Sequence, residues 1–200
     1  MRVHLDAWEF YLKFQGISDD GLPERMHGKR NDDIVREIFG SLLNEEEVVR
    51  HGAAKEALFR QMMRPHLEQK LVPGIRNFLE KWKTMPMGLG SNAEPPNVDF
   101  VLDGARLRSC FQAIVDGHQV QRPKPDPDVY LKAAAQLGVD PRRCIVFEDS
   151  MTGVKAALSA GATVAGIATT SEELPGVELM VRDFADPALE AWLTVACRER

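Results

Sequence analysis

The sequence predicts an α/β protein with a doubly wound parallel sheet and an N-terminal helical cap domain. From Leu71 onward, short apolar runs alternate with helical segments, as in a parallel sheet that is covered by helices on both faces. Before that point, the residues show helical periodicity and no convincing strand. We therefore expect a cap domain over residues 1–70 and an α/β core over residues 71–200.

Three helices are expected in the N-terminal segment. The apolar residues of Leu5–Leu12 recur at helical spacing and form one face of the first helix. Asn31 and Asn44 are suitable N-caps for the second and third helices, because acidic residues follow each of them in the first turn. Pro65 should kink or break the third helix, which otherwise reaches about residue 69.

Turn residues divide the rest of the chain. Pro73-Gly74 marks a hinge or a helix start, and Asp116-Gly117-His118 is expected to form a turn. Asp126-Pro127 is an N-cap and first-turn pair for a helix that ends at Gly138. The expected strands are residues 85–90, 111–115, 144–147 and 162–167. The expected helices are residues 75–83, 98–107, 127–137, 151–160 and 187–197.

The composition excludes several functional classes. The chain has 200 residues, of which 44% are hydrophobic and 28% are charged, as in ordinary globular proteins. A formal net charge of −5 argues against a nucleic acid or an anionic membrane as partner. No apolar run approaches the length of a membrane-spanning helix. Three widely spaced cysteines favour free thiols in a reducing compartment, so we expect a cytoplasmic protein.

Polar residues follow two of the expected strands. Glu148 and Asp149 come directly after the apolar run that ends at Phe147, and paired carboxylates suit Mg²⁺, which prefers oxygen ligands. Ser91 follows an earlier strand, and Lys124 precedes a helix. Each of these residues alone is more often a solvated side chain or a helix cap. Their order along the chain places all of them at one edge of the sheet, where open α/β sheets bind ligands.

These residues resemble the motifs of the haloacid dehalogenase-like hydrolase superfamily, in the branch that contains β-phosphoglucomutase and small phosphatases. Gly88–Asn92 resembles motif II, an apolar strand that ends in Ser or Thr. Arg122–Asp128 resembles motif III, a lysine in a K-P-x-P-D context, and Phe147–Gly153 resembles motif IV. The resemblance spans essentially the whole chain and implies a Rossmann-like core with a helical cap.

The resemblance also implies a function and a role for each residue. The chain would hydrolyse small phosphorylated substrates through an aspartyl-phosphate intermediate. Lys124 would place a positive charge on one phosphate oxygen, and Ser91 and Asn92, with nearby backbone N–H groups, would hold another. Asp149, with Glu148 beside it, would bind the Mg²⁺ cofactor that offsets the charge of the transferred group.

Candidate substrate residues lie in the expected cap. His4 stands where family members often carry a histidine near the cap hinge, and His27-Gly28-Lys29-Arg30 resembles the glycine-containing cap loop. In β-phosphoglucomutases a lysine precedes this glycine and an arginine follows it three residues later. His27 and Asn31 occupy those places, which favours a phosphatase over a sugar-phosphate mutase. The alternatives are that His4 is a partly buried helix histidine and that Lys29 and Arg30 are solvated surface charges.

One motif of the family has no match in this chain. Motif I is a strand followed by D-x-D-G, and it carries the nucleophile and the general acid/base. Asp126-Pro127-Asp128 lies in motif III, and Asp19-Asp20-Gly21 follows no strand. We therefore expect a core lacking its first strand, with the nucleophile upstream of Met1. The protein would be a monomer at full length and a strand-filling dimer if truncated. A β-phosphoglucomutase-like mutase and an inactive phosphate-binding or interaction protein remain as alternatives.

Overall fold

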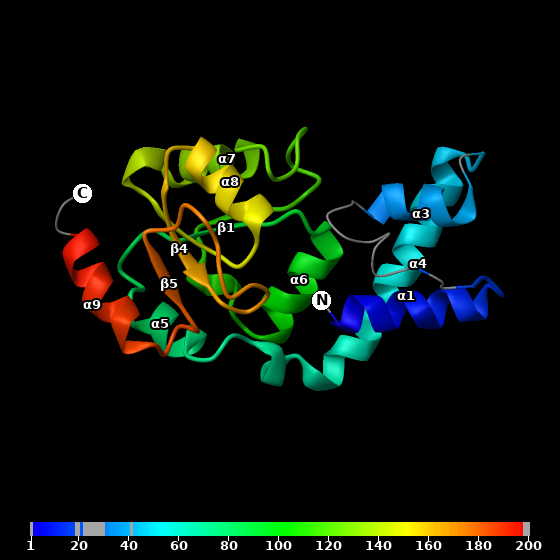
Figure 1. The fold of residues 1–200 in the computed structure, drawn as a ribbon, viewed down its shortest axis with the longest axis horizontal. Helices are drawn as coiled ribbons and strands as arrows, with labels where there is room; N and C mark the ends of the chain where they lie inside the picture. Colours follow the sequence, from blue (N-terminus) through cyan, green and yellow to red (C-terminus); the bar gives the residue numbers. More distant parts are fainter. Residues whose placement is uncertain (1, 19–20, 22–30, 41, 198–200) are drawn as a thin grey trace. The chain divides into compact units, whose positions relative to one another are not determined.

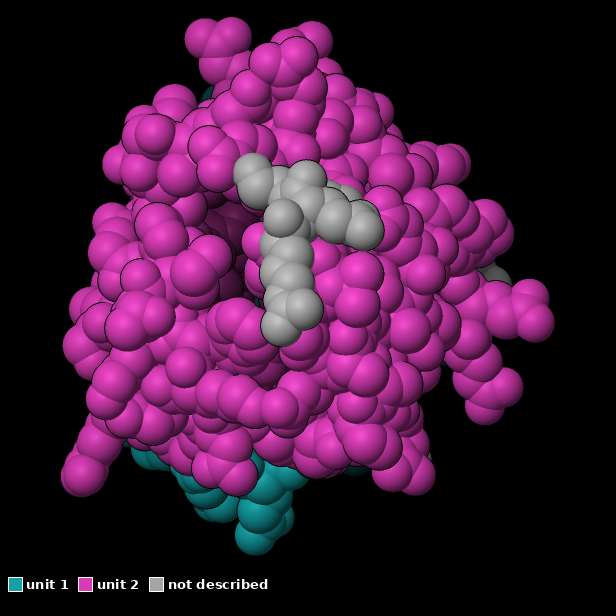
Figure 2. Space-filling model, turned by 90° about the vertical axis from the view of Figure 1, so that its left-hand side faces the viewer, with its two compact units in different colours: residues 1–69 teal, residues 70–200 magenta. Residues whose placement is uncertain are grey.

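The chain forms two compact units, residues 1–69 and residues 70–200 (Figures 1 and 2). A computed structural model describes residues 2–18, 21, 31–40 and 42–197 of the sequence. Within these described stretches, no helix combines the length and the apolar character needed to cross a membrane.

Unit 1 is helical. Helix α1 (Arg2–Phe14) and helix α3 (Asn31–Phe39) both pack against helix α4 (Glu45–Met63). Their common core contains four fully or almost fully buried side chains, which are Trp8, Leu12, Val35 and Val48. Two of these come from the predicted apolar face of the first helix, which is therefore confirmed.

The ends of α4 follow from local sequence. The Asn44 side chain accepts a hydrogen bond from the backbone N–H of Glu47 at 2.9 Å, and the Glu47 carboxylate accepts one from the backbone N–H of Asn44 at 3.0 Å. This reciprocal pair satisfies two backbone donors at the helix start. At the other end, α4 stops at Met63 because Pro65 cannot donate a helical hydrogen bond. Two short 3₁₀ helices, η1 (Arg64–His66) and η2 (Glu68–Lys70), follow.

The described part of unit 2 contains five short parallel strands in two sheets. Strand β1 (Gly88–Gly90) pairs with β2 (Ala113–Val115). Strands β3 (Ile145–Glu148), β4 (Thr163–Ile167) and β5 (Leu179–Val181) form the other sheet in that order. The predicted parallel α/β fold is confirmed. Strand β5 was not predicted, because its three residues are too few to show a period.

Helices cover both faces of the first sheet, as Figure 1 shows for α7 on one side of the strands and α5 on the other. Leu89 and Ile114 pack toward α5 (Ile75–Lys81) and α6 (Pro95–Gly104). On the opposite face, Val115 packs on α7 (Asp128–Leu137). A Cβ atom at Gly90 would lie 3.2–3.4 Å from the side chains of Val129 and Tyr130, so the glycine allows α7 to approach closely.

The second sheet is covered in the same way. Val146 and Val164 pack toward α8 (Met151–Ser159). Phe147 and Ile167 face the other side, with Phe78 of α5 and the apolar side chains of α9 (Pro187–Ala196). Neighbouring residues along each strand thus pack against helices on opposite faces, as in a sheet that is buried on both faces. The remaining short helices of unit 2 are η3 (Arg108–Cys110) and η4 (Pro141–Arg143).

The two sheets lie in one unit but are not hydrogen-bonded to each other. In the described residues, β1 pairs only with β2, and β3 pairs only with β4, so each has one edge without a strand partner. Aromatic side chains link the two sheets on both faces. On one face, Phe78 packs in the hydrophobic core of each sheet. On the other face, Tyr130 packs in the hydrophobic core of each sheet. The space-filling view in Figure 2 shows a recess in the surface of unit 2.

Candidate active site

Lys124 connects the carboxyl ends of β1 and β3. Its ammonium group donates to the carbonyl oxygen of Gly90, the last residue of β1, at 3.0 Å. It also forms an ion pair with Oε1 of Glu148, the last residue of β3. A third bond, 2.7 Å long, goes to the Tyr130 hydroxyl. Only 11% of the Lys124 side chain is exposed, so a buried positive charge stands where both strands end.

The motif II residues hold the loop that carries Lys124. Asn92 Oδ1 accepts a hydrogen bond from the backbone N–H of Lys124 at 3.0 Å, and the Asn92 amide donates back to the Lys124 carbonyl at 3.4 Å. The Ser91 hydroxyl accepts from the backbone N–H of Ala93 at 3.0 Å. Asn92 therefore positions Lys124, whereas the Ser91 hydroxyl can still donate its proton to a phosphate oxygen.

Glu148 is the counter-ion of Lys124. Its Oε1 atom accepts hydrogen bonds from Lys124 and from the Tyr130 hydroxyl. Its Oε2 atom accepts from the Ser150 hydroxyl at 3.1 Å and from the backbone N–H of Asp149 at 3.2 Å. The carboxylate sits over the start of α8, where a Cβ atom at Gly153 would lie 1.9–2.1 Å from it. Both oxygens of Glu148 are thus engaged, which leaves Asp149 as the better metal ligand of the two.

Asp149 is held by two threonines that the sequence reasoning missed. Thr169 donates a 2.6 Å hydrogen bond to Asp149 Oδ2, and Thr170 donates to the Asp149 backbone carbonyl. Both threonines follow β4, the strand next to β3. The feature that could have identified them is the one that identified Glu148 and Asp149, namely polar residues directly after a parallel strand.

Tyr130 is the other residue that the sequence reasoning missed. Its ring is half-buried, and the Lys124 ammonium lies 4.6 Å from the ring centroid. Burial raises the pKa of the Tyr130 hydroxyl, and the neighbouring Glu148 carboxylate raises it further. The hydroxyl therefore stays protonated and can donate to Glu148 throughout the physiological range.

The predicted turn after β2 is confirmed. Asp116 Oδ1 accepts a hydrogen bond from the backbone N–H of His118 at 2.9 Å, and Oδ2 accepts one from the Gln119 side chain at 2.6 Å. This arrangement uses both carboxylate oxygens of Asp116 locally, so the turn is structural.

The predicted cap residues have different outcomes. His27, Gly28, Lys29 and Arg30 lie outside the described residues. His4 lies on α1 within unit 1, stacked on Phe59 with ring centroids 3.7 Å apart. Burial and the Lys55 charge lower the pKa of His4 to about 4, although the neighbouring Glu56 carboxylate acts in the opposite direction. His4 is thus neutral at pH 7, and its 3.9 Å contact with Glu56 is not a charged pair there.

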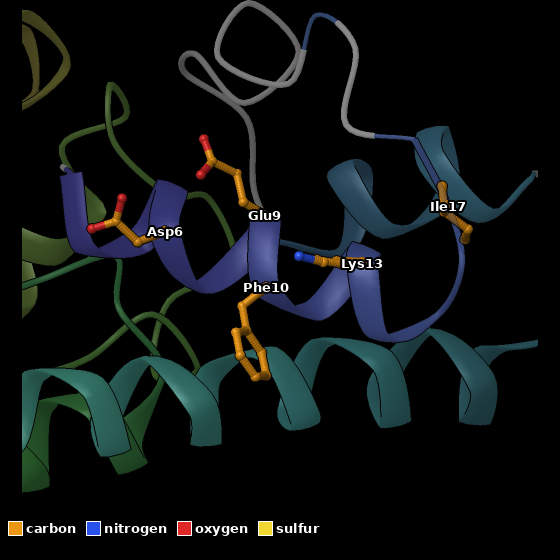
Figure 3. Close-up of a pocket in the computed structure, with 5 residues that line it drawn as sticks. All are labelled: Asp6, Glu9, Phe10, Lys13 and Ile17. Atoms are coloured by element: carbon orange, nitrogen blue, oxygen red, sulfur yellow. The ribbon is translucent and has the colours of Figure 1, made fainter.

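A hollow of about 430 Å³ also lies along α1 in unit 1 (Figure 3). It is lined by Asp6, Glu9, Phe10, Lys13 and Ile17. In the close-up, Phe10 points to the side of α1 that faces α4, away from Asp6 and Glu9. Among the described residues, none of those that resemble motifs II, III and IV lines this hollow.

Among the described carboxylates at the strand ends, Asp149 is the one that best fits a Mg²⁺ ligand. The described residues contain no group of three His, Cys, Asp or Glu side chains close enough to hold a metal ion. Mg²⁺ is, however, commonly bound by one or two carboxylates, with water and substrate phosphate completing the octahedron. Asp149, fixed through one oxygen by Thr169, fits such a partial site.

Comparison with known proteins identifies the family. Residues 11–161 match the haloacid dehalogenase-like hydrolase family. The chain belongs to the haloacid dehalogenase-like hydrolases. The resemblance predicted from motifs II, III and IV is therefore confirmed.

Relatives of this haloacid dehalogenase-like hydrolase include phosphatases and phosphomutases. The chain is 29% identical over 195 residues to a β-phosphoglucomutase of Bacillus subtilis, covering 94% of this chain and 85% of that protein. It is 32% identical over 162 residues to the fructose-1-phosphate phosphatase YqaB of Escherichia coli, covering 80% and 84% of the two chains. Among solved structures, a β-phosphoglucomutase from Clostridium difficile superimposes with a TM-score of 0.82 at 26% identity, covering 99% of this chain and 91% of that one.

Proposed function

We propose that this protein is a Mg²⁺-dependent phosphatase of small phosphorylated metabolites, with sugar phosphates as the first class to test. The observation that carries the proposal is the position of Lys124. Its ammonium group contacts Gly90, the residue before Ser91, and Glu148, the residue before Asp149. The cation thus contacts the residue before a hydroxyl donor and the residue before a candidate metal ligand, and this supports a site for an anionic phosphoryl group.

Each side chain then has a role. Lys124 would neutralise one phosphate oxygen, and the Ser91 hydroxyl would donate a hydrogen bond to another. Glu148 would keep the Lys124 ammonium at the strand ends. Asp149 would hold Mg²⁺, which supplies charge neutralisation at the transferring group. Thr169 would orient the Asp149 carboxylate.

We further propose that the nucleophile is an aspartate at the end of a strand that pairs between β1 and β3. The unpaired edges of these two strands support this, because Lys124 already draws their carboxyl ends together. The aspartate would attack phosphorus to form an aspartyl-phosphate, the ester P–O bond would break, and the alcohol would leave with a proton. Water would then hydrolyse the acyl phosphate.

Sugar-phosphate mutase activity is the second candidate. The similarity to β-phosphoglucomutases along nearly the whole chain favours it. His27 and Asn31 stand where those enzymes carry lysine and arginine, and this favours the phosphatase. A third candidate is an inactive phosphate-binding protein. Incubation of the chain, fused to a strand that carries the nucleophile, with β-glucose 1-phosphate and fructose 1-phosphate distinguishes them: a phosphatase releases inorganic phosphate from both, a mutase yields glucose 6-phosphate from the first, and an inactive protein yields neither product.

We propose that unit 1 is the cap domain of the enzyme and that His4, His27, Gly28, Lys29 and Arg30 contribute to substrate binding. The support is the division of the chain into a helical unit, residues 1–69, and an α/β unit, residues 70–200. The cap role of unit 1 and a cytoplasmic location of the enzyme both stay predictions.

Mg²⁺ binding by the chain is expected to be weak and to depend on Asp149. Replacing Asp149 with asparagine removes the charged ligand, so calorimetry should show loss of the Mg²⁺ heat. Thr169→Val should weaken binding about tenfold or more, because residues that orient a metal ligand typically contribute that much. Asp140→Asn is the matched control, since Asp140 is bound to Arg142 at the start of η4. Equal Mg²⁺ affinity in the wild type and in Asp149→Asn would contradict this assignment.

A further inference from the structure

The Lys124 ammonium has no free hydrogen-bond donor in the described structure. An ammonium has three N–H groups. Lys124 has three acceptors, which are the Gly90 carbonyl, the Tyr130 hydroxyl and Glu148 Oε1. Lys124 must therefore release one of these acceptors before it can bind a phosphate oxygen.

Release from Glu148 is costly unless another donor remains. Glu148 is 7% exposed, and a buried carboxylate oxygen without a hydrogen bond is strongly destabilised. Oε1 has a second donor, the Tyr130 hydroxyl. Tyr130 thus accepts from Lys124 and donates to Glu148 at the same time.

The Tyr130 ring is held by hydrophobic packing as well as by its contacts with Lys124. The ring packs against Val129 and Val115 beside one sheet and against Val154 and Val164 beside the other. A phenylalanine would fill the same space, so packing alone does not require the hydroxyl. The hydroxyl serves the Lys124–Glu148 pair.

We propose that Tyr130 is a positioning residue that lets Lys124 exchange Glu148 for a substrate phosphate, because its hydroxyl keeps the buried Glu148 oxygen hydrogen-bonded when the ammonium leaves. The inference rests on the proposed function, in which Lys124 binds the phosphate. It adds that Lys124 alternates between Glu148 and the phosphate, and that Tyr130 lowers the free energy needed for Lys124 to leave Glu148.

Competitive acetylation tests this proposal on the chain as it exists. Trace acetic anhydride modifies a lysine only when its amine is released from its partners and has lost a proton to solvent, and peptide mass spectrometry gives the rate at Lys124. In Tyr130→Phe, Lys124 becomes the remaining side-chain donor to Oε1 and is held more tightly. We expect its acetylation to slow about tenfold or more, the effect of one hydrogen bond to a charged group. Lys132, which donates to the Gln119 carbonyl on the protein surface, gives the internal reference.

Faster acetylation of Lys124 in Tyr130→Phe would overturn the proposal. If Tyr130 merely fixed Lys124 in place, Tyr130→Phe would loosen the lysine and speed its acetylation. An unchanged rate would also contradict us. Glu148→Gln provides the second variant. In proteins that carry Glu148→Gln, adding Tyr130→Phe should not change the rate of Lys124 acetylation, because the carboxylate charge is gone. Tyr11→Phe, which removes a hydroxyl bonded to His51 in unit 1, should leave Lys124 unaffected.

Inorganic phosphate separates this inference from the proposed function. If phosphate fails to protect Lys124 from acetylation in the wild type while Tyr130→Phe still slows the reaction, the role of Tyr130 in releasing Lys124 from Glu148 stands and the phosphate role of Lys124 fails. If phosphate protects Lys124 equally well in both proteins and their rates without phosphate are equal, the phosphate role stands and the role of Tyr130 fails.

Discussion

Replacing Lys124 with alanine is expected to lower the free energy of unfolding by about 3–5 kcal/mol, the usual result of removing one partner of a buried ion pair. The loss leaves the Glu148 carboxylate buried without its counter-ion. It also removes the link between the ends of β1 and β3. Urea denaturation followed by circular dichroism measures the effect.

Arg122→Ala is the matched control for Lys124→Ala. Arg122 lies two residues away and pairs with Asp126 and Asp128, but it is exposed to solvent. Exposed ion pairs contribute little because water and salt screen them. Equal losses in the two variants would show that the Lys124–Glu148 pair has no special structural role. A double variant with Glu148→Gln should recover part of the stability, since no unpaired charge then remains buried.

Phosphatase turnover is expected to depend on a strand that carries the nucleophile. The 200-residue chain alone should not hydrolyse p-nitrophenyl phosphate, because its described carboxylates at strand ends are engaged by Lys124, by threonines or by a local turn. Fusing an apolar strand followed by Asp-x-Asp-Gly to the N-terminus should produce Mg²⁺-dependent turnover. Changing the first of these aspartates to asparagine should lower kcat by about a thousandfold or more, as removal of a nucleophile does.

Turnover by the unfused chain would contradict the proposed nucleophile if Asp149→Asn abolished that turnover. Such a result would mean that a carboxylate within these residues attacks phosphorus. A fusion that folds and binds phosphate but stays inactive would instead favour the phosphate-binding alternative.

Much of the fold was predictable where one residue has a local effect. Asn44 caps α4 through its own side chain, and Gly138 ends α7 with a positive φ of 70°. Pro65 likewise stops the helix before it. The start of α7 was less accurate: the helix begins at Asp128, while Asp126 accepts a 3.2 Å bond from its N–H. Pro127 is compatible with a helix that begins at residue 127 or at residue 128, so the sequence did not distinguish the two starts.

The site was predictable only in part, because sequence order shows which residues share a sheet edge but not which of them touch. The order placed Ser91, Lys124 and Asp149 together. It did not show that Glu148 pairs with Lys124, since 24 positions separate them. Tyr130 lies within α7 and Thr169 follows β4, and neither position alone marks a role in the site. Their roles depend on the hydroxyl partners, which only the folded chain reveals.

A crystal structure of the protein with Mg²⁺ and inorganic phosphate tests the central claim most directly. We predict a phosphate within hydrogen-bond distance of both Ser91 Oγ and Lys124 Nζ. We also predict Mg²⁺ on the Asp149 oxygen that does not bind Thr169, with the Tyr130 hydroxyl still on Glu148. Phosphate bound elsewhere, with Lys124 still paired to Glu148 and Asp149 free of metal, would contradict the assignment of this edge as the phosphoryl-transfer site.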